Sequence, residues 1–170
     1  MAHTPLAEPA VRPAAPADID AILTLQATAP ECAQWPRSAY AAIFSAPPDA
    51  PLRRGIFCAW AGEKLAGFAV ASALHAAQTC TCELENMAVA TGQRRQGVGR
   101  ALVAAVQAWS LQQQAACVQL EVRASNQAAI QLYGRQGFVA VGRRPGYYSQ
   151  PADDALQMTW IPADGAPFSC

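Results

Sequence analysis

Residues 86–102 read NMAVATGQRRQGVGRAL. An apolar run, Met87-Ala88-Val89, ends a segment with the pattern of a strand, and a turn rich in glycine and arginine follows it. From Val98 onward the apolar residues recur with the period of a helix. The first N–H groups of a helix have no partner within it, and they bind anions such as phosphate. The succession of strand, turn and helix therefore predicts a pyrophosphate site.

This turn differs from the two common phosphate-binding fingerprints. After Gly97 and Gly99, the third position of a dinucleotide-binding motif is Leu102, where glycine or alanine is expected. The chain has no Gly-Lys-Ser or Gly-Lys-Thr, so the turn is not a Walker loop. Glycines would let the backbone approach a ligand closely. Positive charge would come from Arg94, Arg95 and Arg100.

The segments around this turn alternate between strand and helix patterns. Ahead of it we expect a strand at 10–13, helices at 19–29 and 35–44, and strands at 55–61, 65–74 and 79–89. After the helix that begins at Val98 we expect a strand at 117–122, a helix capped by Ser125-Asn126 and ended by Gly137, and strands at 138–141 and 155–160. A loop with Pro145-Gly146 separates the last two. This order, β-α-α-β-β-β-α-β-α-β-β, predicts a mixed α/β (α+β) fold.

The chain of 170 residues is long enough for one domain with a substantial core. We expect residues 1–9 to be a disordered tail, residues 10–161 to be the single domain, and residues 162–170 to be a C-terminal tail. Twelve acidic residues balance twelve basic ones. Neither a nucleic-acid coat nor a polybasic membrane binder is expected from this balance, because both need excess positive charge.

Two long stretches, 65–82 and 101–120, lack Asp, Glu, Lys and Arg. Polar side chains interrupt both, so we predict no transmembrane segment. The N-terminus has no basic start followed by an apolar run, so we predict no signal peptide and a cytoplasmic location. The six cysteines include no Cys-x-x-Cys pair, and we expect buried free thiols and no metal site.

Glu121 is the one carboxylate between Asn86 and Ala152, a segment that holds seven arginines. It lies in the middle of an otherwise apolar strand. Two interpretations stay open from the residues alone. Glu121 either forms an ion pair with a nearby arginine such as Arg123, or serves as a general base beside the cofactor site.

Tyr133 lies on the predicted helix that follows this strand. Its ring either packs in the core, or its phenol donates a proton to a leaving group. Its position in the sequence does not separate these two roles.

Two motifs together resemble the GNAT family of acetyl-CoA-dependent N-acetyltransferases. Residues 94–99, RRQGVG, match the family's Gln/Arg-x-x-Gly-x-Gly/Ala pyrophosphate loop. More narrowly, LEVRASNQAAIQLYGRQGF at 120–138, continued by Arg143-Arg144 and Tyr147-Tyr148, resembles RimI-type enzymes, which acetylate the N-terminal alanine of a ribosomal protein. The likeness covers residues 11–161. It implies the GNAT fold, with a mixed, mostly antiparallel central sheet flanked by helices.

The activity that this resemblance implies is transfer of an acetyl group from acetyl-CoA, without a metal, to the N-terminal alanine amine of a ribosomal or other protein. A small amine or a lysine side chain is the alternative acceptor. A non-catalytic acyl-CoA-binding module is the alternative of another class. No nucleic-acid or membrane partner is implied.

The resemblance also assigns roles to individual residues. The amine proton would pass to Glu121, and Tyr133, beside the cofactor, would protonate the leaving thiolate. Backbone groups of Met87, Ala88 and Val89 would contact the pantetheine arm, and an N–H near Val89 would hold the carbonyl oxygen. The remaining cofactor contacts would come from Arg94, Arg95, Gln96, Gly97, Val98, Gly99, Arg100 and Asn126.

The chain departs from the family's pattern on the acceptor side. The segment from Arg143 to Tyr148 carries one residue more than the expected Arg-Arg-x-Tyr-Tyr, and Glu85 stands where an apolar residue is usual. Glu83 and Glu85 share a strand face, which is either simply solvated, or binds a basic peptide or supplies a second base. With them, Trp35 and Tyr147 are the candidate substrate-binding residues, although Trp35 has core packing as an alternative role.

Overall fold

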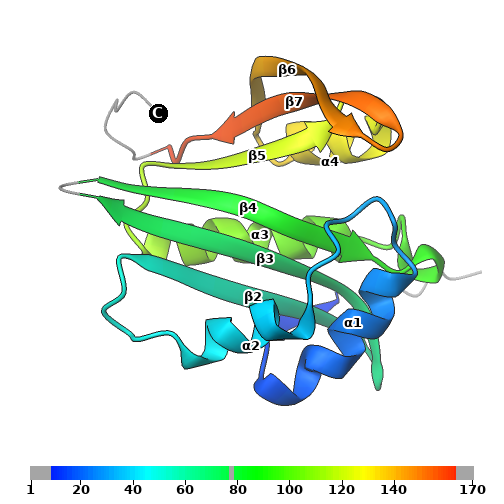
Figure 1. Ribbon diagram of the computed structural model, residues 1–170, viewed down its shortest axis with the longest axis vertical. Coiled ribbons are helices and arrows are strands. Elements are labelled where there is room, and N and C mark those ends of the chain that lie inside the picture. The colour runs from blue at the N-terminus through cyan, green and yellow to red at the C-terminus, as the bar shows by residue number, and fades with distance from the viewer. Residues whose placement is uncertain (1–8, 77–78, 164–170) are drawn as a thin grey trace, which may run out of the picture.

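In the computed structural model, which describes residues 9–76 and 79–163, one seven-stranded sheet has the strand order β1-β2-β3-β4-β5-β7-β6 (Figure 1). Strands β4 and β5 are parallel, and all other neighbours are antiparallel. The strands are β1 (Ala10–Pro13), β2 (Leu52–Ala61), β3 (Lys64–Ala76), β4 (Thr79–Val89), β5 (Cys117–Arg123), β6 (Val139–Ser149) and β7 (Ala152–Trp160). The helices are α1 (Ile19–Ala27), α2 (Arg37–Ser45), α3 (Val98–Gln112) and α4 (Gln127–Arg135), with 3₁₀ turns η1 (Pro16–Asp18) and η2 (Thr91–Gln93).

The predicted order of elements and the mixed, mostly antiparallel sheet are confirmed. The main correction concerns the loop expected between residues 141 and 155, because β6 and β7 continue through it as one long hairpin. Pro145 is tolerated there because β6 is an edge strand, where a missing N–H need not break a ladder bond. The tails predicted at 1–9 and 162–170 lie almost wholly outside the described residues.

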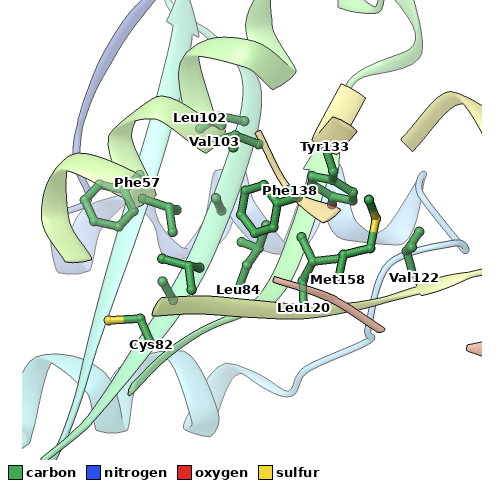
Figure 2. Close-up of a cluster of buried hydrophobic side chains, with 14 of the residues drawn as sticks. Phe57, Cys82, Leu84, Leu102, Val103, Leu120, Val122, Tyr133, Phe138 and Met158 are labelled. Atoms are coloured by element: carbon green, nitrogen blue, oxygen red, sulfur yellow. The ribbon is translucent and has the colours of Figure 1, made fainter. Parts of the chain in front are cut away.

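Side chains on the central strands alternate between two cores. Phe68 and Val70 of β3 pack with α1 and α2, whereas Ala69 and Ala71 belong to the core under α3 and α4. Figure 2 shows part of this second core, in which Leu102 of α3 lies near the strand residues. Because helices cover both faces of the sheet, the central strands read as nearly continuous apolar runs.

A β-bulge at Glu85 reverses this alternation within β4. Val70 of β3 pairs with Asn86, and the next residue of β3 pairs with Leu84, so Glu85 is the extra residue. Leu84, before the bulge, lies in the core with α3, and Ala88, after it, lies in the core with α1. The bulge thereby brings Glu85 and Asn86, which are consecutive, to the side of α1 and α2.

The parallel pairing of β4 with β5, which is the only one among the described strands, is short. β4 and β5 pair from Thr81 with Cys117 to Glu83 with Gln119. Beyond that point β4 continues to Val89 and β5 to Arg123, and Figure 1 shows the two strands running apart. The facing backbone groups in these segments are therefore not used in a ladder between the two strands.

Cys32, Cys58, Cys80 and Cys82 are free thiols, as expected, whereas Cys117 is disulfide-bonded, which corrects the expectation at that position. Burial raises the pKa of Cys58 and of Cys82 to about 12, so both stay protonated at neutral pH. Among the described residues, no cluster of three or more His, Cys, Asp or Glu side chains is arranged to hold a metal ion. None of the helices in the described part of the chain combines the length and hydropathy needed to cross a bilayer.

Candidate active site

The glycine- and arginine-rich turn connects β4 to α3, as predicted. Gly97 is the N-cap of α3, with φ of +84° and no side chain to cap the helix. The N–H of Ala101 donates to the Gly97 carbonyl oxygen at 2.9 Å, which leaves the preceding N–H groups at the open end of the helix. Arg95 is exposed and has φ of +65°. The start of α3 therefore combines backbone donors with arginine charge, which suits an anionic ligand.

Two residues assigned to the cofactor also hold α4 in place. A Cβ atom on Gly99 would lie 2.9 Å from Leu132 Cδ2, so this glycine lets α4 approach the start of α3. Asn126 is the N-cap of α4, and its Oδ1 accepts a hydrogen bond from the Ala129 N–H at 3.1 Å. The start of α3 and the helix that carries Tyr133 are thus packed against each other.

Arg94 connects the end of β4 to the loop between α1 and α2. Its Nε donates to the Val89 carbonyl oxygen at 3.2 Å, and its guanidinium forms an ion pair with Glu31. In the described structure, the Arg94 charge is therefore already partnered by Glu31.

The side chain of Asn86, at the bulge of β4, binds the backbone of the same loop. Its Nδ2 donates to the Ala33 carbonyl oxygen at 2.9 Å, and its Oδ1 accepts from the Ala33 N–H at 3.2 Å. Tyr40, which is fully buried, donates to Gln26 Oε1 at 2.6 Å beside this pair. The loop between α1 and α2 is consequently fixed over the carboxyl-terminal half of β4.

Replacing Asn86 with alanine is expected to lower the free energy of unfolding by about 1–3 kcal/mol, because both polar groups of Ala33 lose their partner. Urea unfolding of Asn86→Ala measures the loss. The exposed Gln131 on α4 provides the control, since Gln131→Ala should stay within about 0.5 kcal/mol of the parent. Equal stabilities for the two variants would contradict a clamping role for Asn86.

Glu121 accepts polar contacts from the β6–β7 hairpin. Its Oε1 lies 3.1 Å from Arg144 Nη1 and accepts a hydrogen bond from Gln157 Nε2 at 3.3 Å. Hydrogen bonding to Glu121 and the charge of that carboxylate raise the pKa of the Tyr147 phenol. The interpretation of Glu121 as an ion-paired residue is thus realised, with Arg144 as the partner.

Arg123, the partner named from the sequence, is engaged elsewhere. It donates to the carbonyl oxygens of Pro151 and Gln150 at 2.9 and 3.0 Å, and its guanidinium lies 4.1 Å from the Tyr148 ring centroid. Arg123 and Glu121 are two residues apart on β5, so their side chains share a face. The Arg123 guanidinium is nevertheless bound at the β6–β7 turn, and Arg144 of β6 contacts Glu121 instead. Pairing between strands therefore decided the partner.

Glu85 is bound by a guanidinium from β2. Arg54 Nε lies 2.7 Å from Glu85 Oε2, Arg54 Nη2 lies 3.0 Å from Glu85 Oε1, and the same guanidinium lies 6.0 Å from the Trp35 ring centroid. Such two-point pairing holds both groups in one geometry. Trp35, Arg54 and Glu85 therefore form one connected group.

Glu83 interacts electrostatically with both Glu85 and Glu121. Its burial raises the pKa of its carboxyl group, and the charges of Glu85 and Glu121 raise it further, against the opposing effects of Arg54 and Arg144. The structure thus brings the predicted acceptor residues Trp35, Glu83, Glu85 and Tyr147 into one electrostatically linked group with Glu121.

Tyr133 lies in the core under α3 and α4, beside Phe138 with ring centroids 5.8 Å apart (Figure 2). Burial raises the pKa of its phenol, so Tyr133 is protonated at neutral pH. Glu121 alternates with Leu120, which faces this core, so the two candidate catalytic residues lie on opposite sides of β5. Tyr148 interacts electrostatically with both of them.

Several contacting residues were not singled out from the sequence. The Arg54–Glu85 pair joins positions 31 residues apart, and the Gln157–Glu121 bond joins positions 36 apart, so no local pattern marks them. Arg144 was marked in the sequence as part of the Arg-Arg and Tyr-Tyr motif, but the motif does not indicate that Glu121 is its partner.

Comparisons with known proteins agree with this geometry. Residues 19–138 match the family model described as the acetyltransferase (GNAT) family. The chain is similar in structure to the ribosomal-protein-S18-alanine N-acetyltransferase from Escherichia coli (26% identity, TM-score 0.71, covering 95% of this chain and 99% of that one). It is also similar to Ard1 from Thermoplasma volcanium (27% identity, TM-score 0.70, covering 89% and 96%).

An uncharacterized protein of Mycobacterium leprae (strain TN) is 31% identical over 127 residues, which are 73% of this chain. The chain spans 32% of the length of that relative. The family model covers well over half of the chain, and the resemblance seen in the two motifs is confirmed. This chain therefore belongs to the GNAT family of acetyltransferases.

Proposed function

We propose that this protein transfers the acetyl group of acetyl-CoA, the donor used by its family, to the N-terminal amine of a protein, with an N-terminal alanine as the first choice of acceptor. The relative of known structure at 26% identity supports a protein acceptor, because it is a ribosomal-protein-S18-alanine N-acetyltransferase. A ribosomal protein is accordingly the first partner to test.

The opening between β4 and β5 is the observation that carries this proposal. Their ladder ends at Glu83 and Gln119, and Glu121 lies two residues further along β5, at the start of the opening. Beyond that point β4 still pairs with β3, but its opposite edge, around Met87, Ala88 and Val89, has no ladder with β5 in the described sheet, and this edge fits an extended arm that carries amide groups. In this proposal the acetyl group at the end of such an arm lies near Glu121, where an amine bound beside that carboxylate can reach it.

The diphosphate of the donor fits the open end of α3. Backbone N–H groups at this helix start and the charge of Arg95 and Arg100 would bind it, with Gly97 leaving the approach open. The other residues proposed around the donor are Arg94, Gln96, Val98, Gly99 and Asn126. When bound, acetyl-CoA supplies an activated acetyl thioester.

The proton chemistry falls to two side chains in this proposal. An α-amine has a pKa of about 8 and must be neutral to attack a carbonyl carbon, so its proton passes to Glu121. Tyr133 is protonated at neutral pH and supplies a proton to the departing sulfur. Both reactants are held in one opening, which removes much of the entropic cost of their encounter.

Release of free thiol from acetyl-CoA in the presence of defined amines tests the proposal. We expect turnover with a peptide that begins with alanine and none with the same peptide whose N-terminus is blocked. Turnover with the blocked peptide only when it contains lysine, or with small amines only, would establish the alternative acceptor. Tight CoA binding without turnover on any amine would establish a non-catalytic acyl-CoA-binding module instead.

A cytoplasmic location, and the lack of nucleic-acid and membrane partners, stay predictions from the sequence. Fractionation of cells that express the tagged chain tests the location.

A further inference from the structure

The extra residue between Arg143 and Tyr148 is accommodated in a bulge of β6 that spans three residues. Arg144 pairs with Ala155 and Tyr148 pairs with Asp153, so residues 145–147 oppose the single residue Asp154. The sequence departure is therefore not a flexible insertion within a loop, because both flanks of the bulge remain in register with β7.

Asp154 holds this bulge from the opposite strand. Its Oδ1 accepts a hydrogen bond from the Gly146 N–H at 2.8 Å, and its Oδ2 lies 2.7 Å from Arg143 Nε. Gly146 has φ of +61°, in the left-handed region that favours glycine. One carboxylate thus accepts bonds from two residues of the bulged segment, and the backbone at Gly146 has the conformation that the bulge requires.

Two residues at the bulge interact with Glu121. Arg144, which precedes the bulge, lies 3.1 Å from Glu121 Oε1, and interaction with the same carboxylate raises the pKa of Tyr147, the last residue of the bulge. The Arg144 guanidinium also lies 5.5 Å from the Tyr147 ring centroid. If residues 145–147 took a regular strand path, the positions of Arg144 and Tyr147 relative to Glu121 would change, because successive strand residues point to opposite faces.

We propose that the Pro145-Gly146 bulge, held by Asp154, is a positioning device that orients the Glu121 carboxylate through Arg144 and Tyr147. This inference rests on the proposed function of Glu121 as the proton acceptor. Asp154 and Gly146 contact no reacting atom, so they act as positioning residues. A displacement of about 1 Å at a reacting group is enough to cost up to about 10²-fold in rate, which is why such a remote support matters.

A pair of substitutions at Gly146 tests the device with a matched control. A Cβ atom at Gly146 meets no atom within 4 Å, so the Cβ of either variant has room. Asparagine adopts the left-handed conformation readily, whereas β-branched valine opposes it. We expect Gly146→Val to lower kcat about tenfold or more with an unchanged Kd for CoA, and Gly146→Asn to stay within about twofold of the parent.

Asp154→Ala provides a second route to the same result. It removes the acceptor for the Gly146 N–H and for Arg143 without introducing backbone strain, so it replaces Gly146→Val if that variant does not fold. We expect the same loss in kcat from Asp154→Ala, and no further loss when Gly146→Val is added to it.

The ionisation of Tyr147 provides a readout that needs no turnover. Its pKa is raised by the hydrogen bond to Glu121 and by the negative charges of Glu121 and Glu83, with Arg144 opposing. NMR titration of the labelled tyrosine ring carbons should show this pKa falling toward its ordinary value in Glu121→Gln and in Gly146→Val, and staying raised in Gly146→Asn.

These measurements separate the inference from the proposed function. A wild-type protein that acetylates no amine would overturn the proposed function, and the Tyr147 titration would still establish whether the bulge places Tyr147 on Glu121. An active wild-type protein, with both kcat and the Tyr147 pKa unchanged in Gly146→Val and in Asp154→Ala, would overturn the positioning device alone.

Discussion

Glu121→Gln should lower kcat at neutral pH about 10²- to 10⁴-fold and leave the Kd for CoA unchanged. Glutamine has nearly the same shape as glutamate, and its amide oxygen can still accept the hydrogen bonds that come from Arg144 and Gln157. It cannot take a proton from an amine at neutral pH. Steady-state kinetics with an alanine-starting peptide, together with CoA binding by calorimetry, would measure both quantities.

Glu83→Gln is the matched control for this prediction, since Glu83 lies in the same electrostatic group but on β4. We expect Glu83→Gln to change the KM for the peptide more than kcat, because Glu83 is proposed to bind the acceptor peptide through its negative charge. The opposite pattern, a large loss of kcat in Glu83→Gln and normal turnover in Glu121→Gln, would transfer the role of base to Glu83. The raised pKa of the Glu83 carboxyl makes that outcome chemically meaningful.

Tyr133→Phe should lower kcat about 10²-fold or more while the protein stays folded. Phenylalanine keeps the ring that packs against Phe138 and loses only the phenol oxygen. The expected loss is therefore one of proton donation to the departing thiolate and not one of packing. Turnover measured with acetyl-CoA, and thermal unfolding measured on the same sample, separate the two effects.

Tyr40→Phe is the control for a buried phenol outside the proposed chemistry. Tyr40 donates to Gln26 beside the loop between α1 and α2, so its loss should destabilise the fold by about 1–3 kcal/mol with little effect on kcat. Should Tyr133→Phe behave like Tyr40→Phe, with lower stability and normal kcat, Tyr133 would be a packing residue and the proton donor would have to be sought elsewhere.

The motif at residues 86–102 predicted a strand, a turn and a helix that begins at Val98, and the structure places α3 there, with Gly97 as its N-cap. Prediction succeeded here because the signals are local. A strand, a left-handed glycine and a helix start are each determined by residues within a few positions of one another. The same holds for the Asn126 cap of α4.

Local signals failed at the bulges. Pro145 and Gly146 are typical turn residues, and they predicted a loop where the structure has a continuous hairpin. Gly146 has a left-handed conformation, but its hydrogen-bond partner, Asp154, belongs to the next strand. The bulge at Glu85 is likewise defined by its pairing with β3 and has no signal within β4.

The sequence by itself determined the order of the elements, the phosphate-type turn and the family, because hydrophobic period, capping and turn chemistry depend on neighbours along the chain. Only the tertiary structure decided that Arg144 contacts Glu121, that Arg54 contacts Glu85, and that Asp154 holds the bulge in β6. These contacts join separate strands, and their register is set by the packing of the whole sheet against two cores. The resemblance could name Glu121 as the base, but strand pairing determined which cation and which phenol face it.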